Sequence, residues 1–570
     1  MRVKIFHLTA IGMLTFLLLS LFSMQVVRGR AYRSLSDKNC IRLIPQKGSR
    51  GDITDRNGTV IAGSAIAYDI VILPQEVAQI DKTLIALSRV VGIEPAQLRK
   101  NFRRFYTSPS MPVTVLKNVD KEKAMRVEEL KLDLDGIIVQ SLPLRTYPFG
   151  KLACHVLGYL SEIDHWRLMK LEDYGYKVGN IVGNGGVEEK YDYYVRQEDG
   201  GLSVEVDHQG RFTRVLGFRS PQKGKDLQLT VDWRIQKIAE DALQDFRGAV
   251  VVLDVFTGEI MALASAPAFD PSAFVARDML SINRSFTDPA APLFNRAISG
   301  SYPPGSVFKV ISAYGALDRS KVSPETTFYC PGSAQIGRRQ FKCWGVHNDQ
   351  SLVAAIAHSC DVYFYRLGLL LGGQAIHDYA VKFGLGKTSG VELPYEATGF
   401  IPNPIWKKLY RLQKWYDGDT ANFVIGQGEL LTSPLQLARL MAVFANGGNL
   451  VTPFIVKAIG GQDVTAGHKR VVPLHLKPAA LRSVKEGLRQ VVADEQGTAG
   501  MLKSAPVSIA GKTGTAEINK VDAHAWFAGF FPYERPRFAI CVFLEKGGHG
   551  YQASMLTKTI VEMMFQEGLL

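Results

Sequence analysis

The sequence has 570 residues, more than one ordinary domain needs, so we expect two or three folded domains. Hydrophobic residues make up 46% of the chain and charged residues 21%, which excludes a disordered protein and provides for large cores. The net charge of +13 is scattered instead of gathered in basic stripes, which excludes a nucleic-acid partner and favours work beside an anionic membrane or polymer.

The N-terminal segment is long and apolar enough to cross a bilayer. After a short tail at 1–4, predicted to be cytoplasmic, an apolar stretch runs from Ile5 to Val27. As a helix this stretch would span about 35 Å, more than the hydrocarbon core of about 30 Å. A cleaved signal peptide would have a shorter apolar region and a small-x-small cleavage site, which the following residues do not offer. The sequence favours an uncleaved anchor at 5–27, and no second such stretch follows.

Residues 28–220 are predicted to form an elongated α+β pedestal module. This module is not expected to be catalytic, because it shows no cluster of residues that could carry a reaction. Near its start, the Asp-Arg-Asn-Gly run at 55–58 separates two β-rich segments. This run predicts a hairpin turn in which Gly58 adopts a positive φ. A Gly/Pro/Lys-rich break at 219–225 predicts the linker to a second domain, which would occupy 221–570.

The second domain shows strands early and late, with helices between them. Two apolar runs, Gly248–Leu253 and Glu259–Ala264, are joined by a short turn and predict an antiparallel hairpin. The segment that follows is mainly helical. Further strand-like runs near the C-terminus lie at 507–510, 525–530 and 538–544. This order indicates an α/β domain with a mainly antiparallel sheet flanked by helices.

A four-residue pattern supplies the first candidate nucleophile. Ser306-Val-Phe-Lys309 follows Pro-Pro-Gly and opens a run with helical apolar spacing. Ser306 would lie at a helix N-terminus, where backbone N–H groups favour developing negative charge, with Lys309 one turn along on the same face. A serine needs a base to accept its proton, and a buried lysine of lowered pKa can act as one. Alone, the pattern more often marks an N-cap serine beside a solvated lysine.

Two further motifs follow in order along the chain. Ser-Cys-Asp at 359–361 stands at the head of another predicted helix, and Lys-Thr-Gly-Thr at 512–515 continues a strand-like run. Ser-x-x-Lys, Ser-Asp-Asn and Lys-Thr-Gly together form the set shared by class A β-lactamases and penicillin-binding proteins. All three rarely arise by chance in this order and on these elements. The sequence therefore indicates serine acyl transfer through Ser306.

Nearly the whole chain resembles the class B penicillin-binding proteins, the monofunctional transpeptidases of peptidoglycan synthesis. Besides the anchor and the three motifs, similar runs occur in the same order at 50–58, 186–192 and 426–428. The Ser-Cys-Asp-Val-Tyr-Phe-Tyr run is most similar to the elongation-type penicillin-binding protein 2. Division-type relatives usually carry Ser-x-Asn, so Asp361 departs from the general pattern in a way that the elongation branch tolerates.

The resemblance implies a serine-type peptidoglycan D,D-transpeptidase that acts in cell elongation and shape maintenance and is a target of penicillin. Ser306 would attack the penultimate D-Ala carbonyl of a stem peptide, release D-Ala and leave an acyl-enzyme. Lys309 would take the hydroxyl proton. Ser359 would relay a proton with Lys512, and Asp361 would hold the lysine amine and the substrate amide.

The third motif is implied to bind the substrate. Lys512, Thr513 and Thr515 would bind its carboxylate, and Gly514 would let the peptide lie along the strand edge. The backbone N–H groups of Ser306 and Thr515 would form the oxyanion hole. The amine of a neighbouring stem peptide would complete the cross-link, and no cofactor is required for this chemistry.

Two other functions use the same motifs. A D,D-carboxypeptidase or β-lactamase would give the acyl group to water, and the long N-terminal module and the anchor disfavour it. A non-catalytic β-lactam-binding sensor or scaffold would act through its partners, and the intact Ser306, Lys309, Ser359 and Lys512 argue against such a loss of activity. The implied partners are donor and acceptor stem peptides, β-lactams, a RodA-type membrane glycan polymerase and other elongation-complex proteins. The bulk of the chain would lie in the periplasm, held by a single inner-membrane span.

Three of the six cysteines lie close in sequence to one histidine, and the set is Cys330, Cys343, His347 and Cys360. Three thiols and an imidazole match a closed tetrahedral site for a structural zinc ion. Some elongation-type relatives are similar here. A Cys330–Cys343 disulfide and unrelated buried thiols are the alternatives. Zinc would fasten the Ser-Cys-Asp motif through Cys360. The remaining cysteines, expected to be buried thiols, are Cys40, Cys154 and Cys541.

Overall fold

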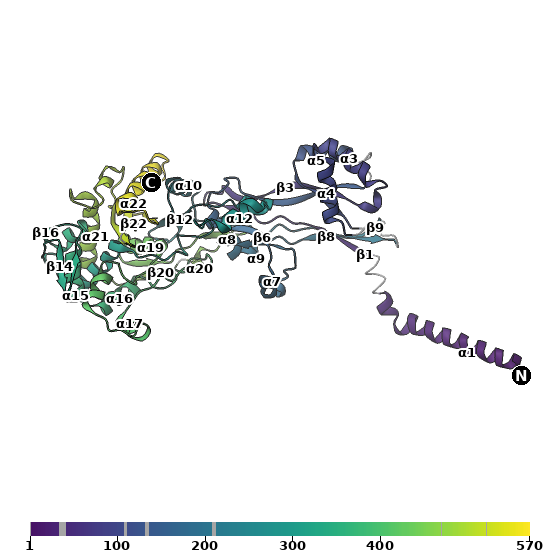
Figure 1. Cartoon of the computed structure of the whole chain (residues 1–570), viewed down its shortest axis with the longest axis horizontal. Helices are drawn as coiled ribbons and strands as arrows, with labels where there is room; N and C mark the ends of the chain where they lie inside the picture. Colours follow the sequence, from purple (N-terminus) through teal and green to yellow (C-terminus); the bar gives the residue numbers. More distant parts are fainter. Residues whose placement is uncertain are drawn as a thin grey trace. The chain divides into compact units, whose positions relative to one another are not determined.

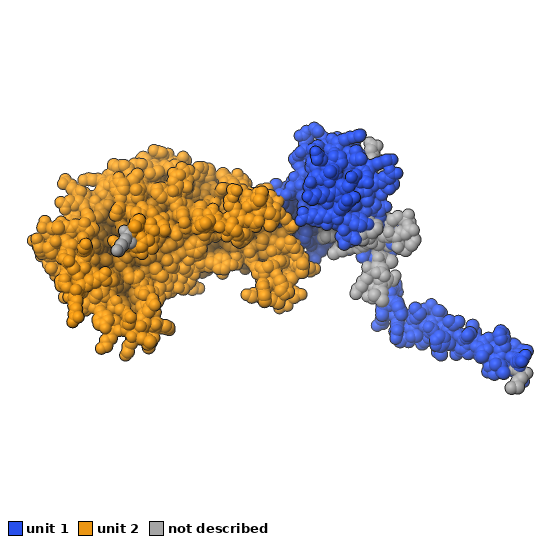
Figure 2. Space-filling view, in the orientation of Figure 1, with its two compact units in different colours: residues 1–51, 64–144, 196–224 blue, residues 52–63, 145–195, 225–570 orange. Residues whose placement is uncertain are grey.

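The computed structural model describes residues 2–33, 41–107, 111–130, 136–207, 212–468, 470–519 and 521–570, so Cys40 lies outside the described residues. The chain forms two compact units (Figure 2). The first comprises residues 1–51, 64–144 and 196–224, and the second comprises 52–63, 145–195 and 225–570. Residues 52–63 and 145–195, which belong to the N-terminal half of the sequence, thus form part of the second unit. The two units therefore differ from the contiguous domains predicted at 28–220 and 221–570.

The chain begins with helix α1 (Arg2–Phe22), which continues as a π-helical turn, η1 (Ser23–Val27) (Figure 1). Residues 2–27 form the one described helix that is long and apolar enough to cross a membrane, with a mean hydropathy of 2.1. Its side chains are not buried against the described protein. Length and composition therefore indicate a single-pass membrane protein, with the apolar helix beginning at Arg2, three residues before the expected start of the span.

The first unit is an α+β structure. Its strands β1 (Ile41–Gln46), β8 (Gly200–Val206) and β9 (Phe212–Arg219) form an antiparallel sheet in the order β1-β8-β9. The later part of β3 (Val60–Ile72) pairs with β4 (Val113–Val119) and β5 (Ile137–Thr146). Helices α3 (Ile80–Val91), α4 (Pro95–Phe105) and α5 (Lys121–Glu129) share an apolar core with β3 and β4, formed around Ile70, Leu84, Leu87, Leu98 and Val115.

The predicted hairpin at 55–58 is confirmed. β2 (Ile53–Thr54) pairs with the start of β3, and Gly58 has a φ of +88°. The fully buried Asp55 carboxylate accepts hydrogen bonds of 2.8 Å from the N–H groups of Asn57 and Thr59. An aspartate side chain that bonds its own backbone stabilises such a turn.

The core of the second unit is an antiparallel sheet, as predicted. Within the described residues five strands form it, in the order β12 (Ile260–Ala266), β11 (Gly248–Asp254), β23 (Phe538–Leu544), β22 (Ala523–Phe531) and β21 (Ala510–Glu517). Successive side chains of a strand point to opposite faces, and every residue of β23 is buried. Both faces are therefore covered, and helices that pack on the sheet include α10 (Trp233–Ala242), α19 (Pro434–Ala445), α21 (Pro478–Ala493) and α22 (Gly550–Gln566).

The long segment between β12 and β21 is mainly helical, also as predicted. Helix α13 (Lys309–Asp318) lies at its centre, because it is almost wholly buried and contacts α15, α16 and α21. The described helices of this segment are α11 (Pro271–Ala276), α12 (Met279–Thr287), α13, α14 (Leu352–Ala357), α15 (Asp361–Leu371), α16 (Gly373–Lys382), α17 (Pro404–Tyr410), α18 (Asp417–Val424), α19, α20 (Thr465–His468) and α21 (Pro478–Ala493).

Two short two-stranded antiparallel sheets interrupt these helices and were not predicted. Their strands pair as β13 with β16 and β14 with β15, and they are β13 (Phe328–Cys330), β14 (Ser333–Ile336), β15 (Arg339–Lys342) and β16 (Asn348–Gln350). The other elements of the unit are α6 (Cys154–Leu157), β6 (Tyr159–Glu162), α7 (His165–Leu171), β7 (Ile181–Asn184), α8 (Gly186–Lys190), α9 (Asp192–Val195), β10 (Leu227–Leu229), β17 (Asn449–Val451), β18 (Val456–Ile459), β19 (Gln462–Asp463) and β20 (Val471–Pro473).

Candidate active site

Ser306 lies in the N-terminal turn of the helix that continues as α13, where the sequence places it. This turn, η4 (Gly305–Phe308), is a 3-10 helix, and Gly305 at its start has a φ of +54°. The Gly305 N–H donates to the Gly426 carbonyl at 3.0 Å, and the Trp526 indole donates to the Pro303 carbonyl at 3.0 Å. The backbone that leads into Ser306 is therefore held from two sides.

Lys309 joins the first motif to the second. Its side chain is fully buried, and its Nζ donates to the Ser359 carbonyl at 2.8 Å and to the Ser359 Oγ at 3.2 Å. Nζ also forms an ion pair of 2.6 Å with Oδ1 of Asp361, whose side chain is 17% exposed. A buried charge is stable only when it is paired and hydrogen-bonded, so Asp361 and Ser359 together hold this amine.

The second motif lies in a tight connection between α14 and α15. Ser359 is buried and has a φ of +55°, a left-handed conformation that is uncommon for residues other than glycine. Cys360 caps α15, since its Sγ accepts the Tyr363 N–H. Asp361 is the first residue of α15, where the helix dipole favours a carboxylate. This connection directs the serine hydroxyl and the carboxylate toward the same lysine amine.

The third motif forms strand β21, at one edge of the sheet. Lys512 is fully buried, and its Nζ donates to the Thr513 carbonyl at 3.2 Å. Burial holds the pKa of the Lys512 amine well below its usual value, the positive charge of Lys309 lowers it further, and Asp361 opposes the shift. The site therefore contains one lysine paired with a carboxylate and a second lysine whose charged form is disfavoured by burial.

The other residues of this strand are tightly engaged. Thr513 shares a hydrogen bond of 2.7 Å with Thr498, and the Thr515 hydroxyl accepts the Gly550 N–H at 3.1 Å. A Cβ on Gly514 would lie 2.8 Å from the Pro304 carbonyl oxygen, closer than real Cβ contacts allow. Strand β21 thus packs against η4, the turn that carries Ser306 (the nucleophile turn), and this packing requires a glycine at position 514. From the sequence, only room for the substrate was expected to require this glycine.

The structure brings all three motifs into one site, although not every predicted contact is present. Among the described residues, the Ser306 hydroxyl makes no hydrogen bond. Ser359 bonds to Lys309 and not to Lys512, which bonds within its own motif. The expected relay between Ser359 and Lys512 therefore has no direct hydrogen bond among the described residues.

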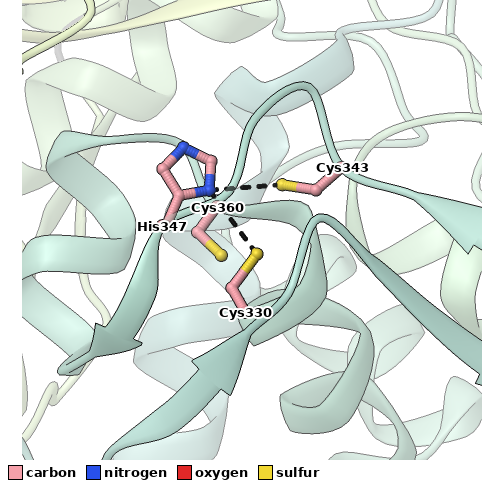
Figure 3. A group of neighbouring side chains, drawn as sticks. All are labelled: Cys330, Cys343, His347 and Cys360. Carbon is pink, nitrogen blue, oxygen red and sulfur yellow. Dashed lines mark hydrogen bonds between the residues drawn. The ribbon is translucent and has the colours of Figure 1, made fainter.

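The four expected metal ligands also come together (Figure 3). The ligand atoms of Cys330, Cys343, His347 and Cys360 all lie within 4.8 Å of one another. The Sγ atoms of Cys330 and Cys343 are 3.6 and 3.5 Å from Nδ1 of His347. The cysteines of the described residues are all free, so the Cys330–Cys343 disulfide is not formed; they are Cys154, Cys330, Cys343, Cys360 and Cys541.

The cluster contacts the catalytic motif directly. Cys343 Sγ accepts the Asp361 N–H at 3.2 Å, and Cys360 stands between Ser359 and Asp361 in the chain. The two short sheets that carry Cys330 and Cys343 thus support the second motif. Of the other cysteines, Cys154 and Cys541 are buried free thiols, as predicted, and burial raises the pKa of each.

Sequence reasoning missed the residues that fix the backbone between the motifs. The turn at Gly426 and Gln427 contacts both the Gly305 backbone and the Thr515 carbonyl, and Trp526 holds Pro303. In the sequence, the Gly-Gln-Gly run at 426–428 was identified only through the family resemblance. Its two glycines predict a turn, but the segments that the turn contacts, at Gly305 and Thr515, are distant in sequence and could not be predicted.

Comparison with known proteins agrees with this geometry. The penicillin binding protein transpeptidase domain model matches residues 248–566, and the penicillin-binding protein dimerisation domain model matches residues 45–229. The chain belongs to the penicillin-binding protein transpeptidase family. Members of this family act without a cofactor.

The relatives resemble the elongation-type branch, as the Ser-Cys-Asp run indicates. Peptidoglycan D,D-transpeptidase MrdA of Acinetobacter baumannii is 31% identical, over 97% of this chain and 86% of that protein. MrdA of Escherichia coli K12 is also 31% identical, over 96% of this chain and 91% of its own length.

Solved structures of penicillin-binding protein 2 and of a peptidoglycan synthase complex also resemble this chain. Helicobacter pylori penicillin-binding protein 2, in a complex with MreC, matches with a TM-score of 0.81 and 27% identity, over 93% of this chain and 99% of that one. A chain of a peptidoglycan synthase complex that coordinates polymerization and crosslinking matches with a TM-score of 0.77 and 29% identity, over 99% and 98%.

The contact between Gly514 and the nucleophile turn predicts the effect of one added methyl group. Gly514→Ala should displace Pro304 and Ser306, and should slow acylation by a fluorescent penicillin by about 10- to 100-fold, because misplacement by about 1 Å costs rate on that scale. Gly500→Ala is the control, since no atom lies within 4 Å of its added Cβ. Unchanged acylation of Gly514→Ala would contradict the assigned packing.

Proposed function

We propose that this chain is a peptidoglycan D,D-transpeptidase that cross-links stem peptides during cell elongation, through an acyl-enzyme on Ser306. The observation that carries the proposal is the buried Lys309 amine, bonded to Ser359 and Asp361 one helical turn from the Ser306 backbone. It unites two distant motifs in one proton-transfer site. The family match and the MrdA relatives support the same reaction.

In the acylation step, Ser306 Oγ forms a bond to the carbonyl carbon of the penultimate D-Ala. The Lys309 ammonium first passes a proton through the Ser359 hydroxyl to the Lys512 amine, and the neutral Lys309 amine then takes the Ser306 hydroxyl proton. The carbonyl electron pair moves onto its own oxygen, which the N–H groups of Ser306 and Thr515 stabilise. When the C–N bond breaks, the departing D-Ala nitrogen takes up a proton from the lysine and Ser359 network. An acceptor amine then attacks the ester and frees the Ser306 hydroxyl.

Lys512 has two roles in this proposal. Burial lowers the pKa of its amine, which makes the neutral, proton-accepting form more accessible than in an exposed lysine, and Lys309 and Asp361 act on it electrostatically, so a proton can be shared through Ser359. Once protonated, it would also attract the substrate carboxylate, which the hydroxyls of Thr513 and Thr515 would bind. Asp361 keeps Lys309 in place throughout.

We propose functional domain limits that follow the family models more closely than the compact units. Residues 1–4 would be cytoplasmic and 5–27 would span the inner membrane. The pedestal would occupy 28–220 and the transpeptidase domain 221–570 in the periplasm, where stem peptides are cross-linked. The solved relatives bound to MreC or in a synthase complex support elongation-complex partners, including a RodA-type polymerase.

We also propose that Cys330, Cys343, His347 and Cys360 bind a structural zinc ion. Bonds of about 2.3 Å to sulfur and 2.0 Å to nitrogen in a tetrahedron separate neighbouring ligand atoms by roughly 3.5 Å. The two Sγ to Nδ1 distances, 3.6 and 3.5 Å, fit that requirement. The ion would supply no chemistry to acyl transfer. Through Cys343 and Cys360 it would stabilise the connection that carries Ser359 and Asp361.

Labelling tests the nucleophile. The full chain in detergent should be acylated by a fluorescent penicillin and should form cross-links from lipid-linked substrate when a glycan polymerase is present. Ser306→Ala should lose both, because no other group can form the ester. Release of D-Ala into water without acceptor amine would favour a carboxypeptidase. Normal labelling without cross-links would favour the sensor or scaffold, and labelling of Ser306→Ala would refute the assignment.

The pH dependence tests Lys512. Because burial holds the pKa of the Lys512 amine well below its usual value, the amine loses its proton at a lower pH than an exposed lysine and becomes charged as the pH falls through that lowered pKa. Acylation should therefore decline as the pH falls through that pKa. Lys512→Arg should lose about 100-fold at every pH, since arginine stays protonated. Exposed Lys414→Arg is the control, and a wild-type pH profile in Lys512→Arg would contradict the role.

Metal analysis tests the cysteine cluster. The full chain, purified under reducing conditions, should contain about one zinc ion per molecule, and Cys330→Ser should lose it, because a closed structural site needs all four ligands. Cys541→Ser should keep the metal, since Cys541 is buried away from this cluster. Removal of zinc should lower the midpoint of thermal unfolding and slow acylation. Protein that lacks zinc yet acylates normally would refute the site.

A further inference from the structure

A turn outside the three motifs contacts two of them. Gly426 follows α18 and has a φ of +77°, and its carbonyl accepts the Gly305 N–H at 3.0 Å. A Cβ on Gly426 would lie 2.0 Å from the Gly305 carbonyl oxygen and 2.9 Å from its nitrogen. The turn is therefore packed directly on the backbone that precedes Ser306, with no room for a side chain.

The next residue reaches the third motif. Gln427 is half-buried, and its Nε2 donates to the Thr515 carbonyl at 3.4 Å. In an antiparallel strand the N–H and C=O of one residue point to the same side. The Thr515 N–H therefore faces the edge of β21 that Gln427 contacts, opposite β22. This is the free edge, where an oxyanion-binding N–H must lie.

The two backbones also touch each other at this point. A Cβ on Gly305 would lie 2.7 Å from the Thr515 carbonyl oxygen and 3.3 Å from its nitrogen. Residues 426 and 427 thus complete a three-way contact among the nucleophile turn, strand β21 and the turn after α18. Of these contacts, the Gln427 side chain is the one that could be altered without adding atoms to the junction.

The base of this turn is itself fixed to the nucleophile helix. The Gly426 N–H donates to the Phe423 carbonyl, and the buried Phe423 ring stacks on Phe308 with ring centroids 5.4 Å apart. The Trp415 indole donates to Thr420 Oγ1 at 2.8 Å, which holds the start of α18. Gln427 therefore extends from a rigid support that moves with the helix carrying Ser306.

We infer that Gln427 is a positioning residue that sets the distance between the backbone N–H groups of Ser306 and Thr515, and so shapes the oxyanion hole. This inference rests on the proposed function. The side-chain hydrogen bond of Gln427 goes to the Thr515 carbonyl. It acts through the Thr515 carbonyl, and its effect should appear in the transition state and not in the first binding of substrate.

Two variants of the full chain in detergent test this. Gln427→Leu removes the donor but keeps the bulk, and Gln427→Glu places a carboxylate against the Thr515 carbonyl at the same length. Exposed Gln413→Leu is the matched control. The measurements are the acylation rate constant and the dissociation constant of the initial complex with a fluorescent penicillin, the affinity of a peptidyl boronic acid that forms a tetrahedral adduct on Ser306, and the midpoint of thermal unfolding.

Gln427→Glu should slow acylation by about 10-fold or more, and Gln427→Leu by less, because loss of a whole oxyanion donor costs about 100- to 1000-fold. Boronate affinity should fall by a similar factor. The initial complex and thermal midpoint should match the control. Unchanged acylation and boronate affinity would overturn the inference. A slower acylation that is accompanied by a lower thermal midpoint and a weaker initial complex would also overturn it, because a general loss of structure would then explain the effect. If wild-type chain is not acylated at Ser306, the proposed function fails, and the inference with it.

Discussion

The buried ion pair between Lys309 and Asp361 is the interaction on which the rest of the site depends. A fully buried ammonium is unstable without a partner, so the fold must bring a carboxylate and further acceptors to it. The carboxylate comes from the first residue of α15 and the other acceptors from Ser359, both about 50 residues away in the chain. Positive charge at Lys309 then disfavours a second charge at Lys512. One pairing thus holds the Lys309 amine in place and adds to the burial that lowers the pKa of Lys512.

Close backbone packing forms the other half of the site. Gly305, Gly426 and Gly514 each leave no space for a Cβ, because each touches the backbone of another segment. The nucleophile turn, the turn after α18 and β21 therefore approach more closely than side chains would allow. Catalysis of acyl transfer depends on fixed N–H groups, and backbone in direct contact is more rigid than backbone separated by flexible side chains.

Much of this could be predicted from the sequence, because the relevant signals are local. The apolar N-terminal stretch, the Asp55 turn, the apolar runs at 248–253 and 538–544, and Ser306 at a helix start each depend on neighbouring residues. The three motifs could be assembled only because a family resemblance supplied their distances. The run at 507–510 was predicted as a strand, and this prediction is wrong for 507–509, because β21 begins only at Ala510.

What could not be predicted depends on partners far apart in sequence. The contact of Gly514 with Pro304, the bond between Gln427 and Thr515, and the support of Asp361 by Cys343 each join segments with no shared local pattern. Residues 52–63 and 145–195 belong to the second unit for the same reason, because their contacts are with residues distant in sequence. The composition of the chain indicates a linker at 219–225, but the division into compact units depends on which strands pair.

The left-handed conformation of Ser359 has a consequence for evolution of the fold. A non-glycine residue at a φ of +55° costs about 1–2 kcal/mol, and a glycine there would relieve that cost. A glycine would also remove the hydroxyl that bonds to Lys309. Selection for thermal stability alone would therefore act against the residue that activity requires. Stability and turnover are opposed at this position, and gains in stability must come from elsewhere in the chain.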